Sequence, residues 1–164
     1  MNHMNKKIIS LAVTAAVLVL IALGSLVIWK MFEPALTENV YPVSVDFRQS
    51  LWTIEGAPAA YFGNEAEGDL NGDSQPDKAF LLTQSPGGSG TFFYVQAALK
   101  TVDGYRATNV ILLGDRIAPQ TTEIRDGRLL VNYADRNPGE PMTASPSLGV
   151  TKYLKIGADG KLSE

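Results

Sequence analysis

An uninterrupted apolar run over residues 8–29 constrains this chain more than any other feature. Lys6 and Lys7 precede the run, Lys30 follows it, and its 22 residues contain no charged side chain. A helix of that length rises about 1.5 Å per residue and crosses a hydrocarbon core about 30 Å thick. The run therefore predicts one transmembrane helix, a signal anchor over residues 8–30, whose partner is the lipid bilayer.

The flanking charges predict the orientation of this anchor. Lys6 and Lys7 favour the cytoplasm, whereas residues 31–47 carry three acidic side chains and no basic one. We expect a cytoplasmic tail at residues 1–7, the cytoplasmic membrane as location, and an extracytoplasmic C-terminal part. A cleaved secretory signal is the alternative, but such signals have shorter apolar cores, and here more apolar chain follows the small residues 22–25.

The composition beyond the anchor excludes several classes of function. We expect a linker over residues 31–40 and one domain over residues 41–164. Residues 31–164 contain all 17 acidic side chains but only 11 of the 14 basic ones, which argues against a nucleic-acid partner. The chain has no cysteine, and its one histidine is His3 in the tail. The domain therefore cannot contain a Ser-His-Asp triad, a Cys-His pair or a histidine-ligated zinc ion.

Alternation of apolar and polar residues predicts an all-β domain, either a meandering sheet or a small barrel. The alternation begins at residues 43–47. Asp-Gly pairs at 103–104, 126–127 and 159–160 are typical of tight hairpin turns. Two loops, 85–90 and 134–149, are flexible connectors or carry function. Further strands are expected at 50–54, 59–64, 78–84, 91–99, 105–113, 121–125, 128–133 and 150–156.

An acidic loop at residues 69–77 is the sharpest local motif. Asp69, Asn71, Asp73 and Asp77 stand at positions 1, 3, 5 and 9 of an oxygen-ligand loop, and Gln75 offers its backbone carbonyl at position 7. Ca²⁺ prefers six to eight oxygen ligands, so the spacing predicts a structural Ca²⁺ site. The flanks are strand-like, which excludes an EF-hand. The alternative is an Asx-rich turn that binds nothing.

This loop resembles the calcium loops of FG-GAP and VCBS-type β repeats, which join two strands of a hairpin. The resemblance implies that Asp69, Asn71, Asp73 and Asp77 are side-chain ligands. The second glycine of the pattern is Ser74 here. A residue other than glycine at positive φ costs about 1 kcal/mol, which would weaken the site.

A wider resemblance extends from residue 61 to about residue 154. This stretch of the chain is similar to an uncharacterised bacterial envelope domain that precedes META-type domains in larger relatives. The resemblance implies a bacterial origin and an envelope location, but no activity. The segments that carry it are 61–64, 87–94, 113–120, 131–136 and 139–142.

Three hypotheses of function follow. The first is a non-enzymatic display protein whose β domain binds an envelope protein or glycan. The second is a cell-wall hydrolase that uses Asp115 or Asp135, although these residues stand beside Arg116 and Arg136 and are also typical of salt bridges that fix loops. The third is a subunit held in an assembly by its membrane helix, for which the helix lacks a Gly-x-x-x-Gly face.

Overall fold

The computed structural model describes residues 40–42 and 44–164, which belong to one compact unit, Glu38–Glu164. The predicted anchor and tail lie outside the described residues. Among the residues that are described, no helix is long and apolar enough to cross a membrane. This part is all-β, as predicted. Its strands are β1 Val40–Pro42, β2 Trp52–Ile54, β3 Ala57–Gly68, β4 Asp77–Gln84, β5 Phe92–Thr101, β6 Gly104–Asp115, β7 Ala118–Arg125, β8 Arg128–Asp135, β9 Leu148–Ile156 and β10 Leu162–Ser163.

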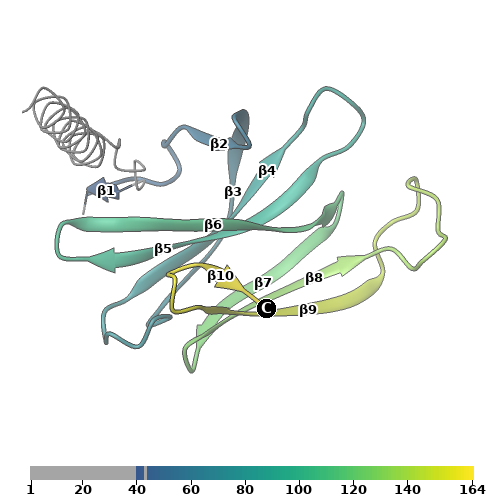
Figure 1. Ribbon diagram of the computed structural model, residues 1–164. Coiled ribbons are helices and arrows are strands. Elements are labelled where there is room, and N and C mark those ends of the chain that lie inside the picture. Colours follow the sequence, from purple (N-terminus) through teal and green to yellow (C-terminus); the bar gives the residue numbers. More distant parts are fainter. Residues whose placement is uncertain (1–39, 43) are drawn as a thin grey trace, which may run out of the picture. The chain divides into compact units, whose positions relative to one another are not determined.

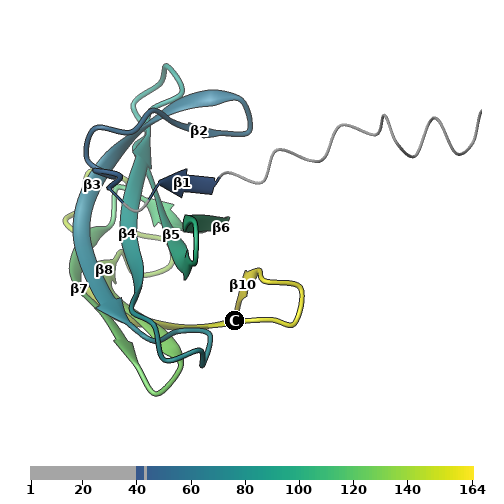
Figure 2. The ribbon, with the colours of Figure 1, turned by 90° about the vertical axis from the view of Figure 1, so that its left-hand side faces the viewer.

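The strands form two antiparallel sheets that curl into a half-barrel (Figures 1 and 2). The six-stranded sheet has the order β1-β6-β5-β4-β3-β2, and the four-stranded sheet has the order β10-β9-β8-β7. Strands β2 to β6 and β7 to β10 each pair with their neighbours in sequence. The domain is therefore two meanders, and only β1 pairs out of sequence order, with β6.

Side-chain contacts join the two sheets at both seams. At the first seam β3 packs so closely on β7 that a Cβ on Gly68 would lie 2.9 Å from Ile124 Cγ2. At the second seam, the side chain of Asn109 in β6 makes the two backbone hydrogen bonds with β10 that a neighbouring strand would make. Its Oδ1 accepts the backbone N–H of Leu162 at 2.7 Å, and its Nδ2 donates to the carbonyl of Leu162 at 3.0 Å.

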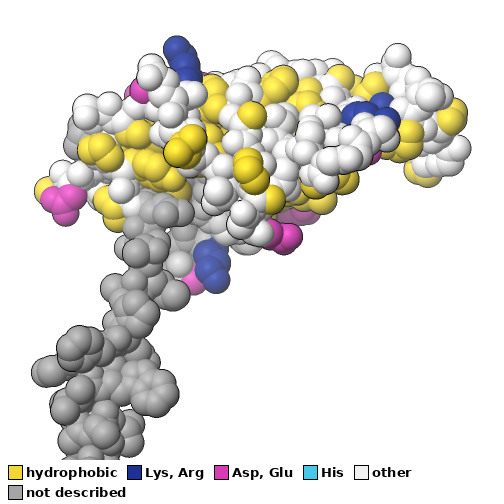
Figure 3. Space-filling view, turned by 90° about the horizontal axis from the view of Figure 1, so that it is seen from above, with side chains coloured by type: hydrophobic (Ala, Val, Ile, Leu, Met, Phe, Trp, Pro, Cys, Tyr) yellow, Lys and Arg dark blue, Asp and Glu magenta, His cyan; other side chains and the backbone are white. Residues whose placement is uncertain are grey.

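Two hydrophobic clusters lie on opposite faces of the six-stranded sheet. In β4, Ala79 and Leu81 belong to the cluster between the two sheets, whereas Phe80 and Leu82 belong to the cluster beneath residues 44–54. Both faces of β4 are thus buried, and each buried Leu or Phe contributes about 1.5–3 kcal/mol. Seen from above, patches of hydrophobic side chains remain exposed and charged ones are few (Figure 3).

The expected strands are confirmed with one exception. The strand predicted over residues 43–47 is wrong at its described residues, 44–47, which contain turns and no strand. Asp46 stabilises these turns, since its carboxylate accepts hydrogen bonds from the backbone N–H of Arg48 at 3.0 Å and from Nε2 of Gln49 at 2.9 Å. Phe47 is nevertheless buried, which explains the apolar position in the sequence. Strands β1 and β10 were not predicted.

The tight turns follow the Asp-Gly pairs in part. Asp126 and Gly127 have φ of 54° and 67°, as the predicted β7–β8 turn requires. The β5–β6 turn is instead made by Val102 and Asp103, and Gly104 begins β6. Gly104 is required for another reason: a Cβ there would lie 1.9 Å from the carbonyl oxygen of Tyr41 in β1.

Candidate functional site

The acidic loop joins β3 to β4 and is held at its start by Asp69. One carboxylate oxygen of Asp69 accepts the N–H of Gly72 at 2.7 Å, and the other accepts the N–H of Ser74 at 2.8 Å. Ser74 has φ of 66°, so the backbone is left-handed where the related pattern has glycine. The loop thus folds around the first carboxylate, with the strain that the sequence predicted at Ser74.

The middle of the loop is a pair of Asx turns. Asn71 Oδ1 accepts the N–H of Asp73 at 3.0 Å, and Asp73 Oδ1 accepts the N–H of Gln75 at 2.8 Å. Asn71 Nδ2 also donates to the second oxygen of Asp73 at 3.0 Å. All three residues are exposed to solvent. These bonds stabilise the loop without an ion, as the Asx-turn alternative requires.

Asp77 differs from the other acidic residues because it is fully buried, with 0% exposure. Its carboxylate accepts the N–H of Leu70 at 2.9 Å and the N–H of Lys100 at 2.7 Å. Burial raises the pKa of Asp77 above its ordinary value, against the backbone donors that lower it. Asp77 therefore ties the loop to β5, which is a structural role independent of any metal.

The five predicted metal ligands lie in one short loop, yet the side-chain oxygens of four of them, Asp69, Asn71, Asp73 and Asp77, already accept hydrogen bonds. Among the described residues, no three His, Cys, Asp or Glu side chains are grouped to hold a metal ion. A carboxylate has about four lone-pair positions, so Asp69 and Asp73 each keep acceptor capacity beyond the bonds described. The Ca²⁺ site stays a prediction.

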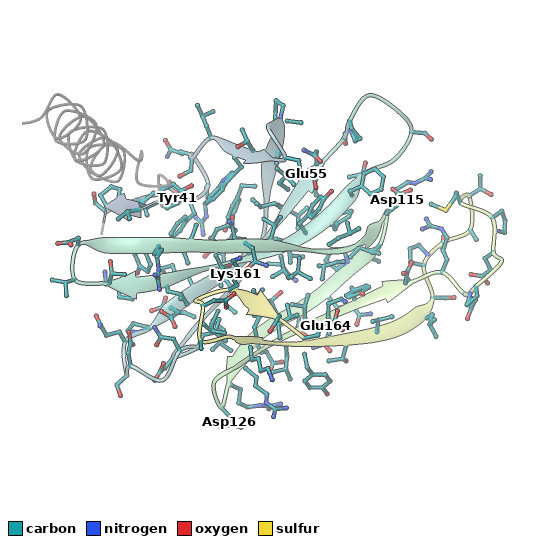
Figure 4. All side chains as sticks on the ribbon, viewed as in Figure 1. Tyr41, Glu55, Asp115, Asp126, Lys161 and Glu164 are labelled. Carbon is teal, nitrogen blue, oxygen red and sulfur yellow. The ribbon has the colours of Figure 1, made fainter. Side chains whose placement is uncertain are left out.

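A second polar cluster joins three loops at the end of the half-barrel where Figure 4 labels Asp115. Asp115 Oδ1 accepts the N–H of Thr91 at 2.8 Å, and Asp115 Oδ2 pairs with Arg116 Nη2 at 3.1 Å. The N–H of Arg116 donates to the carbonyl of Thr91 at 2.7 Å. These contacts fix the start of β5 against the β6–β7 turn.

Arg136 connects the same turn to the long loop that precedes β9. Its Nε donates to the carbonyl of Ala144 at 2.7 Å, and its Nη1 donates to the carbonyls of Asp115 and Arg116 at 3.2 and 3.1 Å. Asp135 accepts the backbone N–H of Arg136 at 2.7 Å. The predicted catalytic candidates thus lie among bonds that hold loops in place.

The pKa of Asp115 suits only one of the two carboxyl roles in a glycosidase. Burial would raise it, but the hydrogen bonds from Arg116 and Thr91 and the nearby arginines bring it below its ordinary value. A glycosidase needs one carboxyl group that stays protonated as the general acid and one that is ionised as the base or nucleophile. Asp115 is therefore suited to accept hydrogen bonds and not to donate a proton.

The structure also brings together a cationic row that sequence reasoning missed. On the outer face of the four-stranded sheet, Arg125 of β7 lies directly opposite Arg128 of β8. The pairing of Leu129 with Leu154 places Lys155 of β9 on the other side of Arg128. The spacing of two arginines around the Asp-Gly turn was a signal in the sequence, whereas the position of Lys155 depends on the β8–β9 register.

The fold and these sites define a small two-sheet half-barrel of antiparallel meanders, with a self-supporting acidic loop and a cationic row. Comparisons with known protein families, with curated proteins and with solved structures find no match for this chain. The resemblance to a bacterial envelope domain therefore remains a prediction from the residues.

Proposed function

We propose that residues 8–30 anchor this chain in a bacterial cytoplasmic membrane and that the β domain binds another envelope component on the outer side without catalysing a reaction. The observation that carries the proposal is the run of 22 residues without a charge, bounded by lysines. A single charged residue at the centre of such a helix costs about 2.5–3.5 kcal/mol on insertion scales, so a charge-free run of this length is typical of a retained anchor.

Binding is favoured over hydrolysis by the contacts that the two carboxylates already make. Asp115 pairs with Arg116 and accepts a backbone N–H, and its pKa is lowered. Asp135 accepts the N–H of Arg136, whose guanidinium bridges two loops. Both residues help to hold a cluster of loops in place. Rigid loops suit recognition because less conformational entropy is lost on binding.

The proposal includes a structural role for Ca²⁺ in the loop at residues 69–77. The crowded acidic side chains of this loop repel one another, and a bound cation would relieve that repulsion. Extracellular Ca²⁺ modules commonly have dissociation constants of about 10⁻⁴–10⁻³ M. An ion at about ten times its dissociation constant would add about 1.4 kcal/mol to the free energy of unfolding.

Alkaline extraction of membranes tests the anchor. The full chain is expected to remain in the membrane pellet, whereas a Leu18→Arg, Val19→Arg double variant is expected to be released because each charge opposes insertion by about 2.5–3.5 kcal/mol. Leu51→Arg is the matched control, since Leu51 is 96% exposed in the domain and the change should leave the chain in the pellet. Release of the unmodified chain would contradict the proposal.

A further inference from the structure

The cationic row consists of Arg125, Arg128 and Lys155, which lie side by side on three neighbouring strands. Arg125 and Arg128 are a directly opposed pair, and Arg128 and Lys155 line one shallow hollow of about 130 Å³. Neighbouring strands are only about 4.8 Å apart, and like charges directly opposite each other destabilise a sheet. The row therefore places like charges side by side on the surface of the sheet.

Acidic side chains lie near the row, but among the described residues only Glu123 forms an ion pair with one of its members, Arg125. In residues 40–42 and 44–164, the side chains of Arg128 and Lys155 make no ion pair or hydrogen bond, and Arg125 has Glu123 at 4.0 Å. Asp126 lines the same groove as Arg125 and Arg128. Glu164 lines the hollow beside Arg128 and Lys155, and its carboxylate pairs with Lys152. Other basic side chains of the domain have partners: Arg48 pairs with a glutamate, and so does Lys78. The row is therefore available to an external anion.

The next positions along the same strands add an aromatic ring and an apolar side chain. Leu130 pairs with Glu123 on one side and with Tyr153 on the other. Tyr153 is 55% exposed and, with Arg128, lines a groove of about 390 Å³. An exposed tyrosine ring beside a guanidinium offers a flat apolar surface and a bidentate donor for carboxylates within the same groove.

A third row offers amide and hydroxyl groups. Asn132 Nδ2 donates to Thr121 Oγ1 at 2.8 Å, and Thr151 Oγ1 donates to Asn132 Oδ1 at 2.6 Å. The outer face of β7, β8 and β9 therefore presents cations, an aromatic ring and hydroxyl-type groups in three successive rows. Sugar rings that carry carboxylates match all three rows. Their carboxylates suit the cations, their C–H faces suit the aromatic ring, and their hydroxyls suit the amide and hydroxyl groups.

We propose that this face binds an acidic polysaccharide, with Arg125, Arg128 and Lys155 holding its carboxylates and Tyr153 stacking on a sugar ring. The inference rests on the proposed function in that the polysaccharide is the envelope component that the domain recognises. A nucleic acid is also a polyanion, and its binding is one of the outcomes of the test below. A lipid surface is disfavoured because only one large apolar side chain, Tyr153, is strongly exposed among the residues of these rows.

Binding of the full chain in non-ionic detergent to polygalacturonate tests the inference, with neutral dextran as the uncharged comparison. We expect binding to polygalacturonate alone, weakening between 50 mM and 500 mM salt because exposed charges are screened. Arg128→Gln should lower the affinity at least about fivefold, as the loss of a charge-assisted bond predicts. Tyr153→Ala should also lower it, at any salt concentration.

Lys161→Gln is the matched control, because it removes one exposed cation from the β9–β10 loop outside the row. Arg128→Gln should melt close to the temperature of the unmodified chain, because the Arg128 side chain is exposed and stands opposite Arg125. Equal losses in Lys161→Gln and Arg128→Gln would overturn the inference. So would equal binding to dextran, or binding only to anionic vesicles or to an oligonucleotide.

The anchor is measured separately, by alkaline extraction. A chain that stays in the membrane pellet but does not bind polygalacturonate contradicts the inference alone. A chain that is released by extraction yet binds polygalacturonate contradicts the anchor alone.

Discussion

Replacing Asp77 should destabilise the domain more than replacing any other acidic residue of the loop. Asp77 is fully buried, and its two oxygens accept the N–H groups of Leu70 and Lys100 at 2.9 and 2.7 Å. Asp77→Ala leaves both donors without a partner in the interior. A buried unsatisfied donor costs about 1–3 kcal/mol, so the free energy of unfolding should fall by about 2–6 kcal/mol.

Two further variants separate this effect from a general effect of charge. Asp77→Asn keeps one acceptor oxygen and should cost about half as much as Asp77→Ala. Asp73→Ala removes an exposed carboxylate whose donor, the N–H of Gln75, can bond to water instead, and it should cost less than about 1 kcal/mol.

Thermal melts of the full chain in detergent, followed by circular dichroism in the β-sheet region, measure these differences. About 4 kcal/mol corresponds to a fall of roughly 10–20 °C in Tm for a domain of this size. An Asp77→Ala variant that melts within about 4 °C of the unmodified chain would refute the structural role of Asp77. Equal losses in Asp73→Ala and Asp77→Ala would refute the argument from burial.

Three other outcomes are expected from melts. Millimolar Ca²⁺, and not Mg²⁺, should raise the Tm, with no rise after Asp73→Ala; a flat response would leave residues 69–77 as an Asx-rich turn. The Tyr61 hydroxyl and Arg48 lower the pKa of Glu65 below 4.5, so its contribution is present at neutral pH and lost as pH falls through the lowered value. Glu65→Gln should therefore make the Tm depend less on pH below about 4.5, and an unchanged dependence of Tm on pH would contradict this. Gly104→Ala should cost at least about 3 kcal/mol because its Cβ would overlap β1, and a normal Tm would refute that packing.

Local patterns were sufficient to predict most strands. The alternation in β4 to β9 follows from half-buried or fully buried sheet positions, and the Asp126-Gly127 turn follows from the φ values that only such residues adopt readily. The Glu55-Gly56 turn has the same positive φ at both positions but was missed, because Glu is not a residue typical of such turns.

Other features depend on contacts that local patterns do not contain. Residues 43–47 alternate like a strand, but Pro42 and the Asp46 carboxylate favour turns, and Phe47 is buried from a turn instead. The two-residue strand β10 depends on hydrogen bonds to Asn109, which is distant in sequence.

The candidate sites were predictable to different degrees. The acidic loop is continuous in sequence, so its residues were found, and Ser74 has the predicted positive φ. The buried position of Asp77 was not predicted, because it depends on the pairing of β4 with β5. The cationic row was missed because Lys155 meets Arg128 only through the register of β8 and β9, which a long loop separates in sequence.

Cysteine labelling of the full chain tests the central claim, a β domain displayed outside the membrane, most directly. The chain has no cysteine, so each variant carries one reactive thiol. Ser89→Cys lies in the exposed loop between β4 and β5, and Asn5→Cys lies in the predicted cytoplasmic tail. In spheroplasts, a membrane-impermeant maleimide should label Ser89→Cys directly and Asn5→Cys only after lysis. Labelling of Asn5→Cys before lysis, or protection of Ser89→Cys until lysis, would contradict the account.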